Sequence, residues 1–274
     1  MVVHMSHDPG PASTAEEQLA RSTEQFGANA QKYTRSAPHA KGASLKRLPE
    51  LVDAQANWHA LDIATGGGHC ALAFAEQVES VVASDATPQM LEAAAGLAAE
   101  RGLMNVTFEP ADAHDLPFDD ATFDLVTCRI APHHFSDPAT FVSEAARVLK
   151  PGGTFGLVDN IAPEDPEAAV WCDDFERRRD PSHARCLPMT EWATLIAAAG
   201  LEQRHAETMG KKMDFAGWAD NMSVPADTRA ELLDDLRNAP TTSAEWLTPN
   251  LGPDGGEADT WFVLTECIIV ATKP

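Results

Sequence analysis

A glycine-rich turn follows directly on an apolar run at residues 61–69, whose sequence is LDIATGGGH. Glycine lets the backbone approach a ligand closely and adopt positive φ angles. A helix that begins after such a turn offers unpaired N–H groups and the positive end of its dipole. The GxGxxG spacing of a dinucleotide-binding turn is absent, because the glycines here are the contiguous Gly66, Gly67 and Gly68. The turn therefore indicates a ligand site that differs from the NAD type.

Two acidic residues follow later apolar runs. Asp85 ends the run at 81–85, about twenty residues after the glycines, where a carboxylate can accept hydrogen bonds from both hydroxyls of a ribose. The alternative makes Asp85 the N-cap of a helix with Pro88 just inside it. Asp112 lies in an acidic stretch at 109–118, which by itself is equally an ordinary loop. Taken with the turn, Asp85 is predicted to bind a ribose.

Alternating strands and helices are predicted to position these residues. The expected strands are at 59–64, 81–85, 106–110, 123–128 and 154–158. The expected helices are at 69–77, 88–101 and 139–149, and residues 115–120 are expected to form a loop. Continuous apolar strands joined by helices indicate a mostly parallel sheet that is covered on both faces. Ligands of such sheets bind beyond the carboxyl ends of the strands.

The flanking segments lack this regular alternation. Helices are predicted at 15–36, 40–52, within 161–187, at 190–199 before Gly200, and at 216–236 with an interruption at Pro225. Strands are predicted within 201–213 and at 260–271, and a loop at 238–259. We expect residues 1–54 to form a helical extension or lid and residues 55–274 to form the main domain. Within that domain, 161–189 and 212–258 are expected to be substrate-cap insertions.

The segments 61–69, 81–91, 109–118 and 123–135, with LKPGGTF at 149–155, occur in an order that resembles class I S-adenosylmethionine-dependent methyltransferases. The likeness is to the ubiquinone/menaquinone-biosynthesis methyltransferase-like group (methyltransferase type 11). It implies an α/β, Rossmann-like methyltransferase fold with a seven-stranded, mostly parallel sheet, helices on both faces, an N-terminal helical lid and a small C-terminal cap insertion. It also implies S-adenosyl-L-methionine as the cofactor.

The resemblance further implies which residues bind the cofactor. Asp62, Ala64, Gly66 and Gly68 match the acidic and glycine positions that pack against its methionine part. Ala64 replaces the usual glycine, which the turn should tolerate if φ there is negative. Asp62 is expected to bind the amino group, directly or through water. The other expected contacts are Asp85 and Ala86 at the ribose, Met90 against the adenine, Asp112 and Ala113 at the adenine edge, and the backbone of Arg129.

Two N-terminal segments, FGANAQKY at 26–33 and HAKG at 39–42, resemble the lid of these enzymes. The resemblance implies that Tyr33 and His39 contact the cofactor. It also implies that the ring of Tyr33 closes over the sulfonium, where a cation gains ~0.5–2 kcal/mol against a ring face. The alternative is an aromatic side chain on a helix face that packs into the core.

Methyl transfer requires a positioned acceptor, exclusion of water and, for an OH, NH or acidic carbon, a nearby base. Histidine suits this role because its charge changes near neutral pH. His133, His134 and His183 are the candidates. We expect His134, beyond the fourth strand, and His183, in the cap, to be catalytic together with Tyr33. Loop packing is the alternative for His133 and His134.

The acceptor is expected to be a small molecule, methylated on an O, N or C atom of a secondary metabolite or a quinone-like ring. Aromatic and apolar side chains in the cap segments suit a flat or apolar substrate. They are expected to line its pocket, with a simple cap core as the alternative: Trp171, Phe175, Phe215, Trp218, Met222 and Trp246.

Charge and cysteine usage exclude several classes of function. The 42 acidic and 20 basic residues give a net charge of −22, which disfavours nucleic acids and anionic membranes as partners. No apolar run is long enough to span a bilayer, and the first residues lack a signal-peptide pattern. Five scattered cysteines without a CxxC pair indicate neither a metal site nor disulfides. We expect a cytoplasmic protein whose partners are a small-molecule substrate and, as an open option, a second copy in a homodimer.

Two other functions are compatible with a sheet of this kind. An NAD(P)-dependent dehydrogenase would require the GxGxxG spacing that this chain lacks. An adenosylmethionine-binding protein that catalyses a non-methylating reaction would keep the same motifs, because pocket and chemistry are separable. Binding of adenosylmethionine without methyl turnover would identify this second class.

Overall fold

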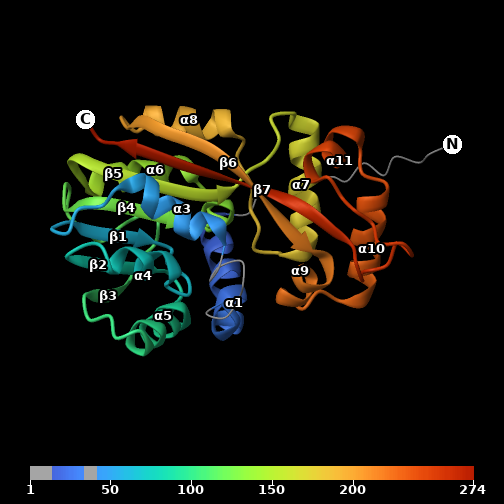
Figure 1. Cartoon of the computed structure of the whole chain (residues 1–274), viewed down its shortest axis with the longest axis horizontal. Helices are drawn as coiled ribbons and strands as arrows, with labels where there is room; N and C mark the ends of the chain where they lie inside the picture. Colours follow the sequence, from blue (N-terminus) through green and yellow to red (C-terminus); the bar gives the residue numbers. More distant parts are fainter. Residues whose placement is uncertain (1–13, 34–41) are drawn as a thin grey trace.

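In the computed structural model, which describes residues 14–33 and 42–274, a seven-stranded sheet lies between two layers of helices (Figure 1). Its strands are β1 (His59–Ile63), β2 (Ser80–Asp85), β3 (Val106–Pro110), β4 (Phe123–Arg129), β5 (Leu149–Asn160), β6 (Glu202–Asp214) and β7 (Trp261–Thr272). The helices are α1 (Ala15–Tyr33), α3 (Ala43–Val52), α4 (His69–Ala75), α5 (Pro88–Glu100), the 3-10 turn η1 (Pro132–His134), α6 (Pro138–Val148), α7 (Pro166–Arg179), α8 (Met189–Ala198), α9 (Phe215–Asn221), α10 (Ala226–Arg237) and α11 (Thr241–Leu247).

The strand order is β3-β2-β1-β4-β5-β7-β6. Neighbours from β3 to β5 pair in parallel, and β7 is antiparallel to both β5 and β6. The predicted Rossmann-like, mostly parallel sheet is therefore confirmed. The chain order reverses between β1 and β4, and at this point a crevice opens beyond the carboxyl ends of the strands.

Each face of the sheet has its own core, because successive strand residues point to opposite faces. Leu61 and Ile63 belong to the core that includes Phe141 of α6 and Trp192 of α8. Ala60, the residue before Leu61, belongs to the other core, with Leu48 of α3 and Phe74 of α4. Burial on both faces accounts for the continuous apolar runs in the strand sequences.

A separate helical lobe consists of α7, α9, α10 and α11 with the adjoining parts of β6 and β7, at the right of Figure 1. Its core contains Phe175, Trp218 and Phe262, whose rings pack at centroid distances of 5.0–5.6 Å. Helix α1 lies between this lobe and the rest of the molecule (Figure 1). The side-chain amide of Gln25 lies 3.1 Å from Sδ of Met222 and links α1 to the lobe.

Most elements form where they were predicted, but the loop expected at 238–259 is partly wrong. It contains α11, which follows Pro240 and buries Leu247 in the lobe core. A helix this short is stable only through tertiary packing, which a local pattern does not reveal. Strand β5 also begins at Leu149 rather than Thr154, because Leu149 still pairs with Phe123 across an irregularity in the register.

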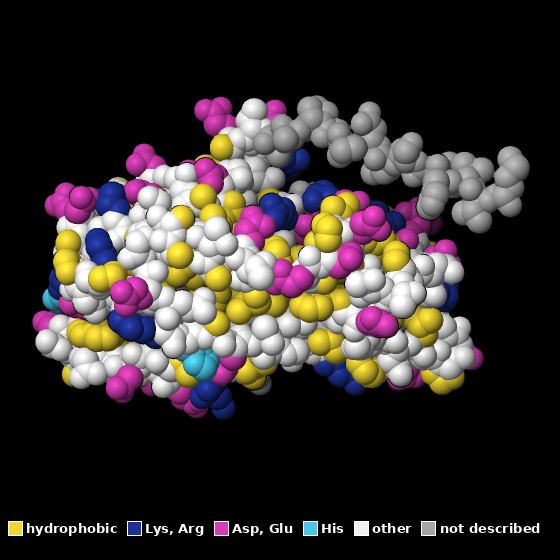
Figure 2. Space-filling view, turned by 90° about the horizontal axis from the view of Figure 1, so that it is seen from above, with side chains coloured by type: hydrophobic (Ala, Val, Ile, Leu, Met, Phe, Trp, Pro, Cys, Tyr) yellow, Lys and Arg dark blue, Asp and Glu magenta, His cyan; other side chains and the backbone are white. Residues whose placement is uncertain are grey.

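Acidic side chains spread over the face shown in Figure 2, and Lys and Arg side chains are interspersed among them. This face carries no continuous basic surface of the kind that binds polyphosphates. In the described part of the chain, no helix combines the length and apolar character needed to cross a bilayer.

Candidate active site

A pocket of about 1030 Å³, partly open to solvent, lies at the carboxyl ends of β1 to β4. Helix α1 contributes Gln18, Ser22 and Phe26 to its wall. The structure brings most of the sequence-predicted site residues to this lining: Asp62, Ala64, Gly66, Asp85, Ala86, Met90, Asp112, Ala113, Arg129 and His134. Segments that follow four different strands therefore converge on one cavity.

Other predicted residues are not on the wall. Gly68 lies behind it, at φ +83°, where an added Cβ would stand 2.9 Å from Cβ of Ala94. Both its positive φ and the close approach of Ala94 therefore favour glycine here, and Gly68 does not line the pocket as the predicted cofactor contact required. His39 lies outside the described residues, as does the side chain of Tyr33, so their lid roles stay predictions.

The turn after β1 departs from expectation at Ala64. Its φ is +50°, in the left-handed region, whereas alanine was expected to be tolerated there if φ were negative. The turn forms nonetheless, held by hydrogen bonds from the backbone N–H of Thr65 to the carbonyl of Ser84 (2.8 Å) and from that of Gly68 to the carbonyl of Thr65 (2.9 Å). A non-glycine residue in this region costs roughly 1–2 kcal/mol, which these contacts must offset.

Asp62 is buried beneath the turn, and both carboxylate oxygens accept internal hydrogen bonds. Oδ1 accepts from the hydroxyl of Thr127 (2.6 Å), and Oδ2 accepts from the hydroxyl of Thr65 (2.6 Å) and the backbone N–H of Ala71 (3.1 Å). Burial raises the pKa of this carboxyl, and the hydrogen bonds oppose the rise. Asp62 thereby ties the turn to β4 and to the first residues of α4.

Asp85, the last residue of the neighbouring strand β2, also stabilises the turn after β1. Its Oδ2 accepts from the backbone N–H of Gly66 (2.9 Å), and its Oδ1 accepts from that of Thr87 (2.8 Å). The side chain is buried, which raises its pKa, but it still borders the pocket. Thr87, not Asp85, is the N-cap of α5, so the helix-cap alternative is wrong. Each carboxylate oxygen keeps a lone pair for a further donor.

The third strand-end segment supplies Asp112 and Ala113. Oδ1 of Asp112 accepts from the backbone N–H (2.9 Å) and Nδ1 (2.7 Å) of His114, which holds the loop in place. Ala113 is buried beside it, and Met90 of α5 is buried on another side of the pocket. This part of the pocket combines an acidic edge with apolar surfaces.

Arg129, at the end of β4, has a buried guanidinium. Its Nε and Nη2 lie 3.3 and 3.2 Å from the hydroxyl oxygen of Ser44 on α3, and therefore connect the N-terminal extension to the sheet. Burial lowers the pKa of Arg129, while the charge of Glu266 opposes the change. The next residue, Ile130, also borders the pocket and has φ +54°.

His134 forms part of the wall, and a loop fixes its ring. Its Nδ1 lies 3.0 Å from the carbonyl oxygen and 3.2 Å from the hydroxyl of Ser182. A carbonyl can only accept, so Nδ1 is assigned the hydrogen and Nε2 is left as an acceptor. Burial lowers the pKa of His134 to about 3, and the imidazole is therefore neutral near pH 7. The side-chain amide of Gln18 binds the carbonyls of His134 and Ser182, at 3.1 and 2.6 Å.

The other two histidines lie behind His134. His133 Nδ1 is 2.6 Å from Oδ1 of Asp159, and burial drives both groups toward their neutral forms: the pKa of His133 falls to about 3 and that of Asp159 rises to about 8. His183 Nε2 is 2.8 Å from Oδ1 of Asp173, and its ring is buried away from the pocket. A base must reach its acceptor, so the direct catalytic contact predicted for His183 does not fit.

The apolar wall opposite the strand ends was not among the predicted site residues. Leu19 and Phe26 on α1 and Phe135 after η1 line it, and the Phe26 ring packs edge-on against His134 at 4.8 Å. The spacing of Leu19, Ser22 and Phe26 places them on one helix face. This spacing was a sequence signal for the wall, but helical periodicity does not identify the surface against which a helix face packs.

The aromatic side chains of the cap segments do not line this pocket. Phe175, Phe215 and Trp218 are buried in the core of the helical lobe, and Trp171, Met222 and Trp246 pack against it. The prediction that they surround the acceptor is wrong for this cavity, and the simple-core alternative is confirmed. Large aromatic surfaces are buried most effectively against one another, which the stacked Trp171, Phe175 and Trp218 rings achieve.

Comparisons with known proteins add to this geometry. A family model described as a methyltransferase domain matches residues 61–157. YcgJ of Bacillus subtilis, named an uncharacterized methyltransferase, is 36% identical over 230 residues, which is 84% of this chain and 91% of that protein. The crystal structure of YcgJ matches with a TM-score of 0.80 and covers 84% of this chain and 97% of that one.

Two further relatives have names that specify a reaction. Demethylmenaquinone methyltransferase of Deinococcus radiodurans is 42% identical over 105 residues, 38% of this chain and 43% of that protein. The 27-O-demethylrifamycin SV methyltransferase of Amycolatopsis mediterranei is 31% identical over 169 residues, 60% of this chain and 61% of that protein.

Proposed function

The chain belongs to the S-adenosylmethionine-dependent methyltransferase family, and from this premise we propose that it methylates a small, largely apolar acceptor held against α1. The observation that carries the proposal is the convergence of three acidic strand-end segments and one apolar wall on a single pocket. The names of the quinone and rifamycin methyltransferases support an acceptor of this class. The methylated atom is an O, N or C atom of a quinone-like ring or a secondary metabolite.

The pocket fits the cofactor in charge and in shape. Three acidic residues, Asp62, Asp85 and Asp112, border it, against the single guanidinium of Arg129 among the described residues, so the polar end suits a ligand that carries positive charge. Apolar surfaces at Met90 and Ala113 suit a flat ring. When bound, S-adenosylmethionine supplies a methyl carbon that is activated by a positive sulfur.

Each strand-end residue has a distinct proposed part. Asp85 accepts from ribose hydroxyls with the lone pairs that Gly66 and Thr87 leave free, and Ala86 lies beside it. Asp112 and the backbone at Ala113 bind the adenine edge. Asp62 acts mainly by holding the turn, because both of its oxygens already accept internal hydrogen bonds.

The acceptor is proposed to lie between Phe26, Phe135 and His134. These side chains form an apolar wall with one basic nitrogen, and no Lys or Arg other than Arg129 lines the pocket in the described residues. Helix α1, clamped through Gln18 to the loop at Ser182, excludes water from this side. We therefore propose that residues 1–54 act as the lid, with the lobe segments 161–189 and 212–258 supporting the acceptor side from behind.

His134 is proposed to accept a proton from the acceptor through Nε2. Its Nδ1 is held by the Ser182 carbonyl, and burial keeps the ring neutral, so the lone pair on Nε2 is available. Because the pKa of about 3 makes the imidazole a weak base, it takes the proton as the new bond to the methyl carbon makes the acceptor acidic. His134→Gln should lower kcat by ~10²–10⁴ for an oxygen acceptor while leaving adenosylhomocysteine affinity unchanged. An unchanged kcat would remove His134 from this role.

Transfer of a labelled methyl group tests the proposal directly. The chain is incubated with methyl-labelled S-adenosylmethionine and, in separate reactions, a reduced naphthoquinone, a hydroxylated macrocycle and a charged hydrophilic amine. We expect label in one of the two apolar acceptors and none in the amine. Transfer only to the charged amine would contradict an apolar acceptor site. Cofactor binding with no transfer at all would favour a non-methylating reaction.

A further inference from the structure

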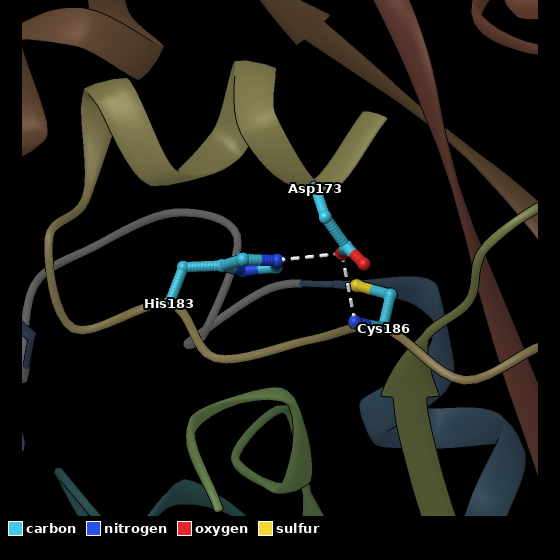
Figure 3. A group of neighbouring side chains, drawn as sticks. All are labelled: Asp173, His183 and Cys186. Carbon is cyan, nitrogen blue, oxygen red and sulfur yellow. Dashed lines mark hydrogen bonds and ion pairs between the residues drawn. The ribbon is translucent and has the colours of Figure 1, made fainter. Parts of the chain in front are cut away.

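We propose that Asp173, His183 and Cys186 form a binding site for one divalent metal ion of the Zn²⁺ class. All three side chains are buried, and their ligand atoms lie within 4.8 Å of one another. Asp173 comes from α7, and the other two come from the loop that follows this helix. Figure 3 shows the imidazole of His183 and the sulfur of Cys186 both turned toward the carboxylate of Asp173.

The three donor types suit a borderline-soft cation. Zn²⁺ binds imidazole nitrogen, thiolate sulfur and carboxylate oxygen at about 2.0–2.3 Å, usually with four ligands in a tetrahedron. Oδ1 of Asp173 is already 2.8 Å from Nε2 of His183 and 2.9 Å from the backbone nitrogen of Cys186. When the ion binds, it takes the place of the hydrogen between Nε2 and Oδ1, the imidazole carries its hydrogen on Nδ1 instead, and the Cys186 thiol releases its proton to solvent as the sulfur binds.

A second, independent feature points to a missing positive charge. Glu176, one turn along α7 from Asp173, is 8% exposed, and its Oε1 is buried without a hydrogen-bond partner among the described residues. The nearest cation, Arg179, reaches only Oε2, at 3.4 Å. A buried carboxylate oxygen that lacks a donor is costly, and a divalent cation nearby offsets that cost.

A small cavity borders two of the three proposed ligand residues. Asp173, Glu176 and Cys186 border the same space of about 380 Å³, together with Cys172. The hydrogen bond between His183 and Asp173 satisfies one oxygen of Asp173 without a metal, but it supplies no donor to the Glu176 oxygen. An ion bound by Asp173, His183 and Cys186 would place positive charge near the Glu176 carboxylate and would have a fourth position for a further ligand.

An ion at this site would fasten the loop 180–187 to α7. That loop holds η1 in place, because the backbone N–H groups of Ala184 and Arg185 donate to the carbonyl of His133 at 2.9 and 3.1 Å. The proposed metal site lies outside the methyl-transfer pocket, and this inference does not depend on the acceptor or on the reaction.

Titration of the untagged, reduced, metal-free chain with Co²⁺ tests the site without any activity measurement. We expect one equivalent to bind and to produce a thiolate-to-cobalt charge-transfer band in the near ultraviolet. Cys186→Ser should abolish the band and weaken Zn²⁺ binding more than about tenfold. Cys172→Ser, which changes a thiol on the same cavity, is the matched control and should retain both the band and the affinity.

His183→Gln provides a second variant in case Cys186→Ser does not fold. It should keep the thiolate band but weaken Zn²⁺ binding more than about tenfold. Circular dichroism of each metal-free variant establishes that it is folded. Failure of the parent chain to bind one equivalent, or a band that is lost in Cys172→Ser but kept in Cys186→Ser, would overturn the assignment.

Discussion

At the carboxyl ends of β1, β2 and β3, each carboxylate accepts a hydrogen bond from a backbone N–H in a following loop or helix: Ala71 of α4 for Asp62, Gly66 for Asp85 and His114 for Asp112. The helical lobe is organised differently, by aromatic rings that come from separate helices and strands. The strand-end pocket thus depends on main-chain geometry, and the lobe depends on side-chain packing. We expect substitutions in the two regions to affect different measurements.

The largest expected effect is on the lobe core. Trp218 is 1% exposed and packs against Phe175 and Phe262 at 5.0 Å. Trp218→Ala should lower the free energy of unfolding by ~3–5 kcal/mol, because it leaves a large cavity. Denaturant titration measures this loss. Trp218→Phe is the milder companion if the alanine variant does not fold. In the folded variant, adenosylhomocysteine affinity should be unchanged, and a parallel fall would show that the two regions are not separable.

A smaller effect is expected at Asp62, where stability and binding should fall together. The Asp62→Asn substitution replaces one carboxylate oxygen by an NH₂ group. This group then faces a donor of Thr65, Ala71 or Thr127 from which the oxygen had accepted a hydrogen bond. An unsatisfied buried donor costs ~1–3 kcal/mol, which a denaturant titration would detect. Adenosylhomocysteine should also bind more weakly, because the turn is no longer fixed. A variant as stable as the parent would contradict the bonding described here.

His133 and His134, together with Asp159, predict a maximum in stability near pH 6.5. The pKa values of His133 and His134 fall from 6.5 to about 3 on folding, so protons bind the unfolded chain first and stability decreases as the pH falls below 6.5. The pKa of Asp159 rises from 3.8 to about 8, so the folded chain holds the extra proton and stability decreases as the pH rises toward 8. Thermal unfolding measured from pH 4 to pH 9 would show both the acidic and the alkaline decrease in stability.

Asp159→Asn separates the two contributions. An amide does not titrate, so the decrease between pH 6.5 and 8 should disappear while the acidic limb remains. If the alkaline limb persists in this variant, the pKa of Asp159 is not raised on folding.

The smallest effect is expected at Ala64, where the left-handed backbone is unfavourable for alanine. Ala64→Gly should change the free energy of unfolding by no more than about 1 kcal/mol, toward greater stability, since relief of strain exceeds the added chain entropy. Ala60→Gly, on β1 and buried, is the matched control and should destabilise by ~0.5–1 kcal/mol. Equal losses in both variants would contradict the strained conformation of Ala64.

The difference between the strand-end pocket, which depends on main-chain geometry, and the lobe, which depends on side-chain packing, explains which features could be predicted from the sequence. Asp62, Asp85 and Asp112 were identified because short-range patterns fix them: an apolar strand, then a turn whose amides bind the carboxylate. The positive φ of Ala64 escaped prediction because it results from tertiary hydrogen bonds around the turn. The wall formed by Leu19 and Phe26 was missed because a helical stripe does not reveal its partner surface.

Prediction failed most clearly in the lobe. Trp171, Phe175 and Trp218 looked like pocket residues by type, but they stack on one another across α7 and α9. The contact between Asp173 and His183 joins a helix to the loop after it, and spacing alone did not indicate this pair. Likewise, His183 was expected at the acceptor, and only the fold shows that it lies behind His134.

Calorimetric titration of Asp85→Asn with adenosylhomocysteine tests most directly whether the strand-end carboxylates form one cofactor cradle. We expect binding weakened by ~1–3 kcal/mol, roughly 5- to 150-fold, because a charged acceptor is lost. Asp115→Asn, a neighbouring acid outside the pocket lining, should bind like the parent chain. Unchanged affinity in a folded Asp85→Asn chain would contradict the account.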